Sequence, residues 1–203
     1  MTNRIAKASW VGLMAIALLL MVGCRSVDST AMVGQPSPEA AQYVKGIWQL
    51  GDAIFYATAG NEPGRIEAAS LEWKDGKWQM NPQTFFAATL NGKTYLNLQV
   101  DPKSTKADKP VTYTFVKLLG DVASKNPPDQ LVVLMANIDA FAKLVQEGKL
   151  AGKVDIDSKK NQPTNVHLTA TADQLNAIIQ ADTSGTLFDE THPVVLLRRG
   201  NVK

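Results

Sequence analysis

The sequence lacks the residues that most metal and disulfide frameworks are built from. It has one cysteine and two histidines in 203 residues. A chain with a single cysteine cannot form an internal disulfide, so burial of apolar side chains must hold the fold together. His167 lies in an alternating apolar run, where we expect it to be satisfied or solvent-facing, and His192 precedes Pro193 in an expected surface turn. Two separate histidines of this kind predict no metal site.

Familiar catalytic patterns are also missing from the sequence. There is no Gly-x-Ser-x-Gly nucleophile motif and no glycine-rich phosphate loop after an expected strand. The acidic stretch from Asp155 to Asn161 lacks the central glycine and the closing glutamate of a calcium loop, so we interpret it as a solvated turn. The sequence therefore predicts no catalytic residues, no cofactor and a non-enzymatic function.

The chain has little excess charge of either sign. It contains 21 Lys and Arg against 19 Asp and Glu, and Arg4 and Lys7 are the only charged residues before Cys24. Removing those two leaves 19 of each sign from Cys24 onward. Such a balance offers no broad basic face for a nucleic acid. Because 45% of the residues are hydrophobic, we expect one folded domain with its own core.

What is present at the start of the chain is a short basic head followed by an apolar run. The run WVGLMAIALLLMV covers 13 residues from Trp10 to Val22. This length is typical of a signal peptide and falls short of the roughly 20 apolar residues of a membrane-spanning helix. The run leads directly into Gly23 and Cys24, after which the residues become polar.

The segment Leu20-Met21-Val22-Gly23-Cys24 resembles the lipobox of bacterial lipoproteins, with Met21 in place of the usual leucine. This resemblance implies a lipoprotein signal peptide over residues 1–23 and cleavage between Gly23 and Cys24. The Cys24 thiol would then carry diacylglycerol and its new amino group an acyl chain. Two or three acyl chains anchor a protein stably to a membrane. The alternatives are a cleaved secretory signal or an uncleaved anchor.

By the same resemblance, Arg25 stands where an aspartate would be the retention signal for the inner membrane of enteric bacteria. We therefore expect a lipid-anchored protein of the cell envelope, on the outer membrane if the organism has one. Residues 24–42 are small, polar and proline-containing, which predicts an acylated cysteine and a flexible tether. Residues 43–203 then form a single β-rich domain.

Alternation of apolar and polar residues predicts a mainly β (α+β) fold, an antiparallel meander of about eight strands. Asp75-Gly76 and Asn91-Gly92 lie between alternating runs, as in tight hairpin turns. The expected strands cover 44–48, 53–58, 65–73, 78 onward, 84–90, 93–100, 111–119, 131–135 and 194–198. Two amphipathic helices are expected in the C-terminal half, one after Asn137 and one at the capping-box pattern from Thr171 to Gln174.

Gly46-Ile47-Trp48 in the first expected strand and Arg198-Arg199 in the last resemble lipocalins and related small β-barrels. In that family an arginine of the last strand covers the tryptophan of the first. The resemblance implies a meander rolled into a barrel, with one guanidinium within about 6 Å of the Trp48 ring. We favour Arg198 over Arg199, because Arg198 continues the alternation of Val194 and Leu196. The alternative is that both arginines face solvent and Trp48 is an ordinary core residue.

Three functions remain open from the sequence. The first is a non-enzymatic binding or scaffolding module, whose partners are the membrane and an envelope protein or small apolar ligand. The second is a lipocalin-like carrier, which requires a pocket of several hundred Å³. We expect that pocket to be lined by Phe85, Phe86, Tyr95 and Leu98. The third is a hydrolase with His167 or His192 beside a serine or an acid in a cleft.

Overall fold

The computed structural model describes residues 25–51, 53–74, 77–100, 110–120 and 128–200. The signal peptide, the cleavage site and the lipidation of Cys24 fall outside these ranges and stay predictions. The predicted turn residues Asp75 and Gly76 also lie outside them. No helix within the described ranges is both long and apolar enough to cross a membrane.

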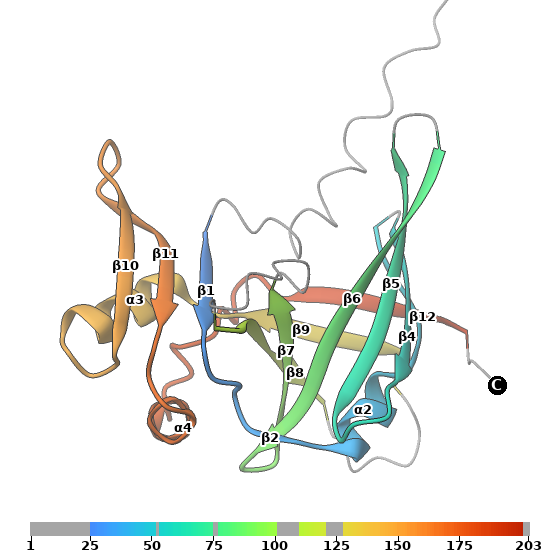
Figure 1. The fold of residues 1–203 in the computed structure, drawn as a ribbon, viewed down its shortest axis with the longest axis horizontal. Coiled ribbons are helices and arrows are strands. Elements are labelled where there is room, and N and C mark those ends of the chain that lie inside the picture. Colours follow the sequence, from blue (N-terminus) through green and yellow to red (C-terminus); the bar gives the residue numbers. More distant parts are fainter. Residues whose placement is uncertain (1–24, 52, 75–76, 101–109, 121–127, 201–203) are drawn as a thin grey trace, which may run out of the picture.

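Eight antiparallel strands close into a barrel (Figure 1), which confirms the mainly β fold and the expected eight-stranded meander. Each strand pairs with the next, and the last returns to the first, so no edge of the barrel sheet is left open. The strands are β3 (Gly46–Leu50), β4 (Ala53–Ala59), β5 (Arg65–Lys74), β6 (Lys77–Leu90), β7 (Lys93–Val100), β8 (Thr112–Leu119), β9 (Gln130–Met135) and β12 (Val194–Gly200).

The hairpin between β6 and β7 has the turn that the sequence predicts. Leu90 pairs with Lys93, and the two residues between them both have positive φ, 48° at Asn91 and 72° at Gly92. Two successive positive φ angles twist the chain in the sense that the flanking strands need, and asparagine and glycine adopt them at low cost.

A smaller layer packs on the outside of the barrel against β7, β8 and β9. It contains β1 (Ser26–Ser29), β10 (Gly152–Asp157), β11 (Gln162–Leu168), and the helices α3 (Ile138–Gln146) and α4 (Ala172–Ala181). Asn137 and Thr171 cap the two helices, as the sequence predicts. The structure has two hydrophobic cores, one inside the barrel and a second between the barrel and this layer. In the second core Phe115 of β8 contacts Phe141 of α3, with 5.5 Å between the ring centroids.

The prediction of a flexible tether over residues 24–42 is wrong for the part of this segment that the structure describes. Strand β1 lies between β8 and β11, β2 (Gln35–Pro36) pairs with β6, and α2 (Pro38–Val44) packs against β4, β5 and β6. Val27 and Val33 are buried in the second core, and Ala40 and Ala41 in the barrel core. The folded part therefore begins next to Cys24, well before Tyr43.

Buried amide side chains explain why this polar segment is ordered. The Asn97 side chain accepts a hydrogen bond from the Val33 backbone N–H at 2.8 Å and donates one to the Val33 carbonyl at 3.1 Å. Asn176 accepts another from the Gly34 N–H at 2.9 Å. These bonds satisfy a backbone that forms little regular structure of its own. Helix α2 has local signals as well, since Ser37 caps its first turn and Pro38 opens it.

Candidate functional site

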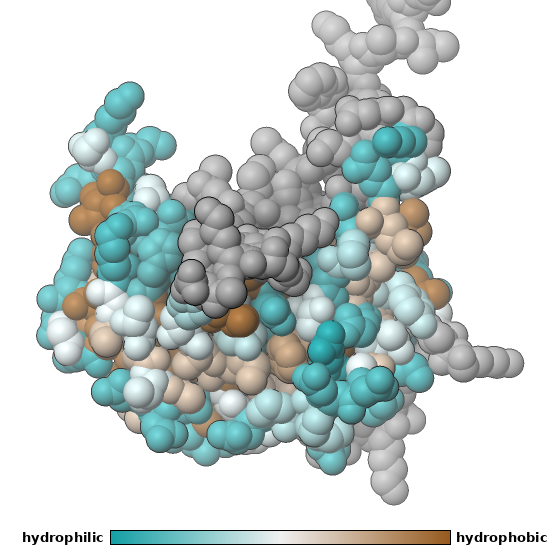
Figure 2. Space-filling view, viewed as in Figure 1, coloured by the Kyte–Doolittle hydropathy of each residue, from teal (hydrophilic) through white to brown (hydrophobic). Residues whose placement is uncertain are grey.

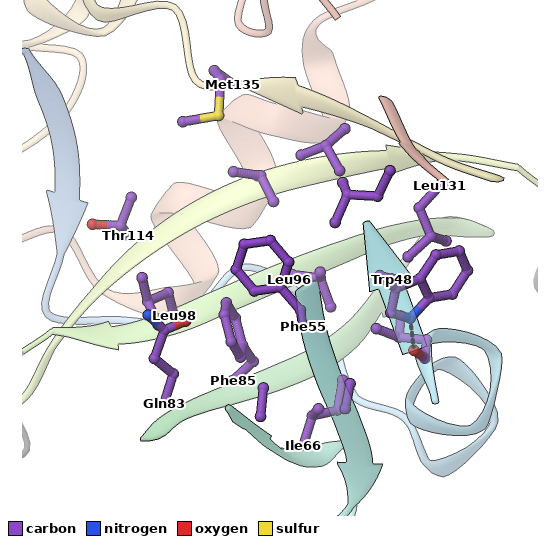
Figure 3. A pocket seen from close by; sticks show the side chains of 16 residues that line it. Trp48, Phe55, Ile66, Gln83, Phe85, Leu96, Leu98, Thr114, Leu131 and Met135 are labelled. Carbon is purple, nitrogen blue, oxygen red and sulfur yellow. Dashed lines mark hydrogen bonds between the residues drawn. The ribbon is translucent and has the colours of Figure 1, made fainter. Parts of the chain in front are cut away.

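The interior of the barrel encloses an apolar cavity of about 90 Å³ (Figure 3). Among the residues that the structure describes, Gln83 and Thr114 are the two polar ones in its wall, and none of the described lining residues is charged. A wall of this composition favours a ligand whose buried part is uncharged, because an unpaired charge inside the cavity would lose its hydration. The lining residues are Val44, Trp48, Phe55, Ala57, Ile66, Ala68, Gln83, Phe85, Leu96, Leu98, Thr114, Val116, Leu131, Val133, Met135 and Leu196.

One end of the cavity is closed by Trp48, which is 2% exposed. The indole Nε1–H donates to the Val44 carbonyl at the end of α2, at 2.7 Å, so the helix and the first barrel strand are joined under the cavity (Figure 3). Arg198 lies over a face of the ring, with its guanidinium carbon 4.4 Å from the ring centroid. This is the distance of a cation–π contact.

The contact between Arg198 and Trp48 is therefore present as the sequence argument predicts. The two residues are paired neighbours on β12 and β3. The Arg198 Nε also donates to the Pro128 carbonyl at 2.8 Å, and burial lowers the pKa of its guanidinium. Arg199 points the other way, is exposed, and donates to the Gln49 side chain on the outer surface. Only one of two consecutive strand residues can face the barrel end.

Gly46 has a specific reason to be glycine at this end of the barrel. Its φ is +151°, and a Cβ atom there would lie 2.7 Å from Nη1 of Arg198. A side chain would therefore displace the guanidinium that covers Trp48. The Gly-x-Trp pattern and the C-terminal arginine, read from the sequence as a resemblance, are thus one packed unit in the structure.

The cavity is not fully enclosed, and its lining is more exposed at the end opposite Trp48. Leu98, Thr114 and Met135, which lie at the mouth end of β7, β8 and β9, are only half-buried, whereas Ile66 and Leu131 near the closed end are buried. Exposure of the lining thus rises from the Trp48 end toward the strand ends near Val100 and Thr112. The structure brings both polar lining residues to this half of the cavity (Figure 3).

The expected set of lining residues is half right. Phe85 and Leu98 line the cavity, while Phe86 and Tyr95 point to the outer side of the same strands. Phe86 contacts Tyr113, and Tyr95 belongs to the second core, 5.7 Å from the Phe188 ring. Neighbouring residues on a strand face opposite ways, so Phe85 and Phe86 cannot share one cavity. The volume is also smaller than the several hundred Å³ that the carrier hypothesis expects.

His167 lies outside the barrel, in the added layer, between two carboxylates. Its Nδ1 is 2.8 Å from Asp28 of β1, and its Nε2 is 3.2 Å from Asp155 of β10. The hydrogen bond with Asp28 is the main cause that raises the pKa of His167. Lys153 also holds Asp155, at 2.6 Å. Because carboxylates occupy both ring nitrogens, neither is left to activate a nucleophile.

His192 lies in an exposed loop, as expected, where its Nδ1 is 3.0 Å from Asp189. That carboxylate also accepts bonds from the Thr191 hydroxyl and backbone, and together these bonds hold the pKa of Asp189 at about 2. Within the ranges that the structure describes, no three His, Cys, Asp or Glu side chains are grouped to hold a metal ion. The barrel cavity is therefore the site that the geometry favours.

Comparison of the chain with protein-family models, with curated proteins and with solved structures found no match.

Proposed function

We propose that this protein is a lipid-anchored binding protein of the bacterial cell envelope, whose barrel takes up one slender apolar chain such as an acyl chain. The observation that carries the proposal is an apolar cavity inside a closed barrel, plugged by Trp48 at one end and with a more exposed lining at the other. Sites for small apolar ligands are commonly found in the mouths of β-barrels.

The size of the cavity supports a narrow ligand. Pockets for drug-sized molecules measure roughly 300 to 1,000 Å³, and an apolar cavity of about 150 Å³ accepts benzene. A cavity of about 90 Å³ suits part of a single hydrocarbon chain and excludes a bulky ring system. Gln83 and Thr114 lie near the open end, where a polar head group of the ligand could accept or donate hydrogen bonds.

Binding of an apolar fluorescent probe without rings, a linear fatty acid with conjugated double bonds, tests the cavity. The chain from Arg25 to Lys203 contains every contact described above and no cysteine, so it serves as the soluble protein for this titration. Leu98→Trp fills the half-buried mouth of the cavity and should weaken binding at least tenfold. Val195→Trp places the same ring on the outer face of β12, where Val195 is 39% exposed, and should leave binding unchanged. Equal binding by both variants would contradict the proposed site.

Fractionation of the cell envelope tests the anchor separately. The full-length protein should stay with membranes after a carbonate wash, and Cys24→Ala should remove the acyl chains that hold it there. If Cys24→Ala behaves like the unchanged protein in the pellet, lipidation of Cys24 is not the anchor. The probe titration does not depend on this result, because the chain from Arg25 lacks the lipid.

A further inference from the structure

The β5–β6 hairpin and the adjoining strand β4 carry an exposed apolar patch on their outer face. Ile54, Leu71, Trp78 and Met80 are 47%, 48%, 65% and 69% exposed. They are neighbours in the sheet, since Ile54 pairs directly with Leu71, and Leu71 with Met80. We call these four residues the hairpin patch. Lys77, also exposed, follows the turn of the same hairpin. Contiguous exposed apolar side chains beside a basic residue are typical of a surface that meets a membrane.

The β10–β11 hairpin repeats this combination on the other side of the molecule. Ile156 is 49% exposed, and Lys159 and Lys160 at the tip are exposed as well. The one acid of the tip, Asp157, is engaged by the turn, where it accepts a hydrogen bond from the Lys159 backbone at 2.8 Å. In Figure 2 hydrophobic surface lies below a hydrophilic tip on both hairpins. Lysines at such positions are attracted to anionic lipid head groups.

Arg25 and Ser26, the first described residues, lie next to the β10–β11 hairpin and directly follow Cys24 in the sequence. Strand β1 runs parallel to β11 with Ser26 opposite Asn165, so the chain before Ser26 leads toward the hairpin tip. Arg25 holds this place by donating to the Pro163 carbonyl at 3.2 Å and by pairing with Asp139 at 2.8 Å. Cys24 is therefore about 7 Å of chain from Ser26 at most. The lipid would emerge there with no long tether.

The open end of the cavity lies on the same side as these features. Because the barrel strands alternate in direction, the β5–β6 turn belongs to the same barrel end as the half-buried lining residues Leu98 and Met135. Asp28, four residues after Cys24, pairs directly with the lining residue Thr114. Figure 1 shows the tips of both hairpins and the Ser26 end of β1 pointing to the same side of the molecule.

We propose that the hairpin patch and the β10–β11 tip rest on the lipid surface on either side of the Ser26 end of β1, so that the mouth of the cavity faces the bilayer. The inference rests on the proposed lipidation of Cys24. In this orientation an acyl chain would have only a short path through water between the membrane and the barrel. A single lipid anchor would leave the orientation free, whereas contacts on both sides of the Ser26 end of β1 fix it.

Fluorophore labelling of the lipidated protein in vesicles tests this orientation. In the mature protein the Cys24 thiol is consumed by the lipid, so one introduced cysteine is the only free thiol. Met80→Cys and Ser158→Cys place an environment-sensitive label on the two hairpins, and Asn61→Cys places it in the exposed β4–β5 loop at the closed end. The vesicles contain phosphatidylethanolamine and phosphatidylglycerol, with and without a spin-labelled lipid quencher.

Labels at positions 80 and 158 should shift their emission to the blue and be quenched at least twofold more strongly than the label at position 61. Equal quenching at the three positions, or stronger quenching at position 61, overturns the proposed orientation. Flotation of the labelled protein with the vesicles reports the anchor independently. A protein that floats with the vesicles but is quenched equally at the three positions therefore contradicts the orientation and not the lipidation.

The patch itself is tested with the unlipidated chain from Arg25 to Lys203. This chain should sediment with the same vesicles, and the double change Trp78→Ser and Met80→Ser should reduce the bound fraction at least threefold. Leu119→Ser with Val195→Ser removes two exposed apolar side chains elsewhere on the barrel and should leave the bound fraction unchanged. An equal loss in both pairs, or no loss in the first, contradicts the proposal. Binding of the apolar probe in solution reports the cavity in every variant.

Discussion

Arg198 lies against the face of Trp48, 4.4 Å from the ring centroid, although 150 residues separate them in the chain. The contact joins the first and last strands of the barrel and closes one end of its cavity. It therefore couples barrel closure to the shape of the binding site.

Replacement of this arginine should destabilise the fold. Arg198→Ala removes a cation–π contact worth roughly 0.5 to 2 kcal/mol and a hydrogen bond to the Pro128 carbonyl worth about 1 kcal/mol. We expect the free energy of unfolding in urea to fall by about 2 kcal/mol. Arg199→Ala is the matched control, because the exposed Arg199 side chain should contribute less than about 0.5 kcal/mol. Equal losses for the two variants would show that the contact has no special role.

The β6–β7 turn offers a test of backbone strain without steric contact. No atom outside the turn lies within 4 Å of a Cβ built on Gly92, and its φ is +72°. Gly92→Val should therefore cost about 1 to 2 kcal/mol through the left-handed conformation alone. Gly92→Asn should cost much less, since asparagine tolerates this region. A valine variant that melts at the wild-type temperature would contradict the turn geometry.

Asn97 should be essential for holding the N-terminal segment on the barrel. Asn97→Ala leaves the backbone N–H and carbonyl of Val33 without their buried partner, and an unsatisfied buried group costs about 1 to 3 kcal/mol. Gln99→Ala, two residues along the same strand and half-buried, is the control. Hydrogen exchange at Val33 should accelerate in the first variant only. Unchanged exchange there would mean that other contacts order the segment.

His167 should make stability depend on pH. Its pKa is raised mainly by the hydrogen bond with Asp28, with Asp155 adding to the effect and Lys153 facing Asp155. The folded state therefore binds the His167 proton more tightly than the unfolded state, whose histidine pKa is about 6.5. This stabilisation is complete below that value and is lost as pH rises through the folded-state pKa.

Unfolding free energies between pH 6 and pH 9 check this dependence. Because the His167 side chain is 44% exposed, the effect should stay below about 1 kcal/mol. His167→Gln cannot titrate and should lose less stability over the same interval than the unchanged protein. Identical pH profiles for the two proteins would contradict the prediction.

Local patterns were sufficient to predict the barrel strands and both C-terminal helices. Alternation of side chains and the Asn91-Gly92 pair define hairpins within a few residues, and the capping residues Asn137 and Thr171 mark the helix starts. The closure contact between Trp48 and Arg198 was also accessible, because alternation along the last strand decides which arginine faces inward. These features depend on residues close together or on a single pairing.

The N-terminal segment and the cavity mouth depend on distant residues and could not be predicted in the same way. Val33 is buried because Asn97 and Asn176 come to it from other elements, and no periodicity in the segment itself reveals this. Gln83 and Thr114 line the cavity only because the barrel closes with a particular stagger. The separation of Phe85 from Phe86, by contrast, followed from strand alternation and could have been predicted.

The most direct test of the proposed binding site is methyl NMR of the chain from Arg25 to Lys203, titrated with a 16-carbon fatty acid. Leu96, Leu98 and Leu196 line the cavity, whereas Leu168 and Leu175 are buried in the second core. Their methyl signals therefore report the two interiors separately. We expect saturable shifts at the first three residues and unchanged signals at the other two. Shifts confined to the second core, or none at saturating fatty acid, would contradict the proposal that the barrel binds an acyl chain.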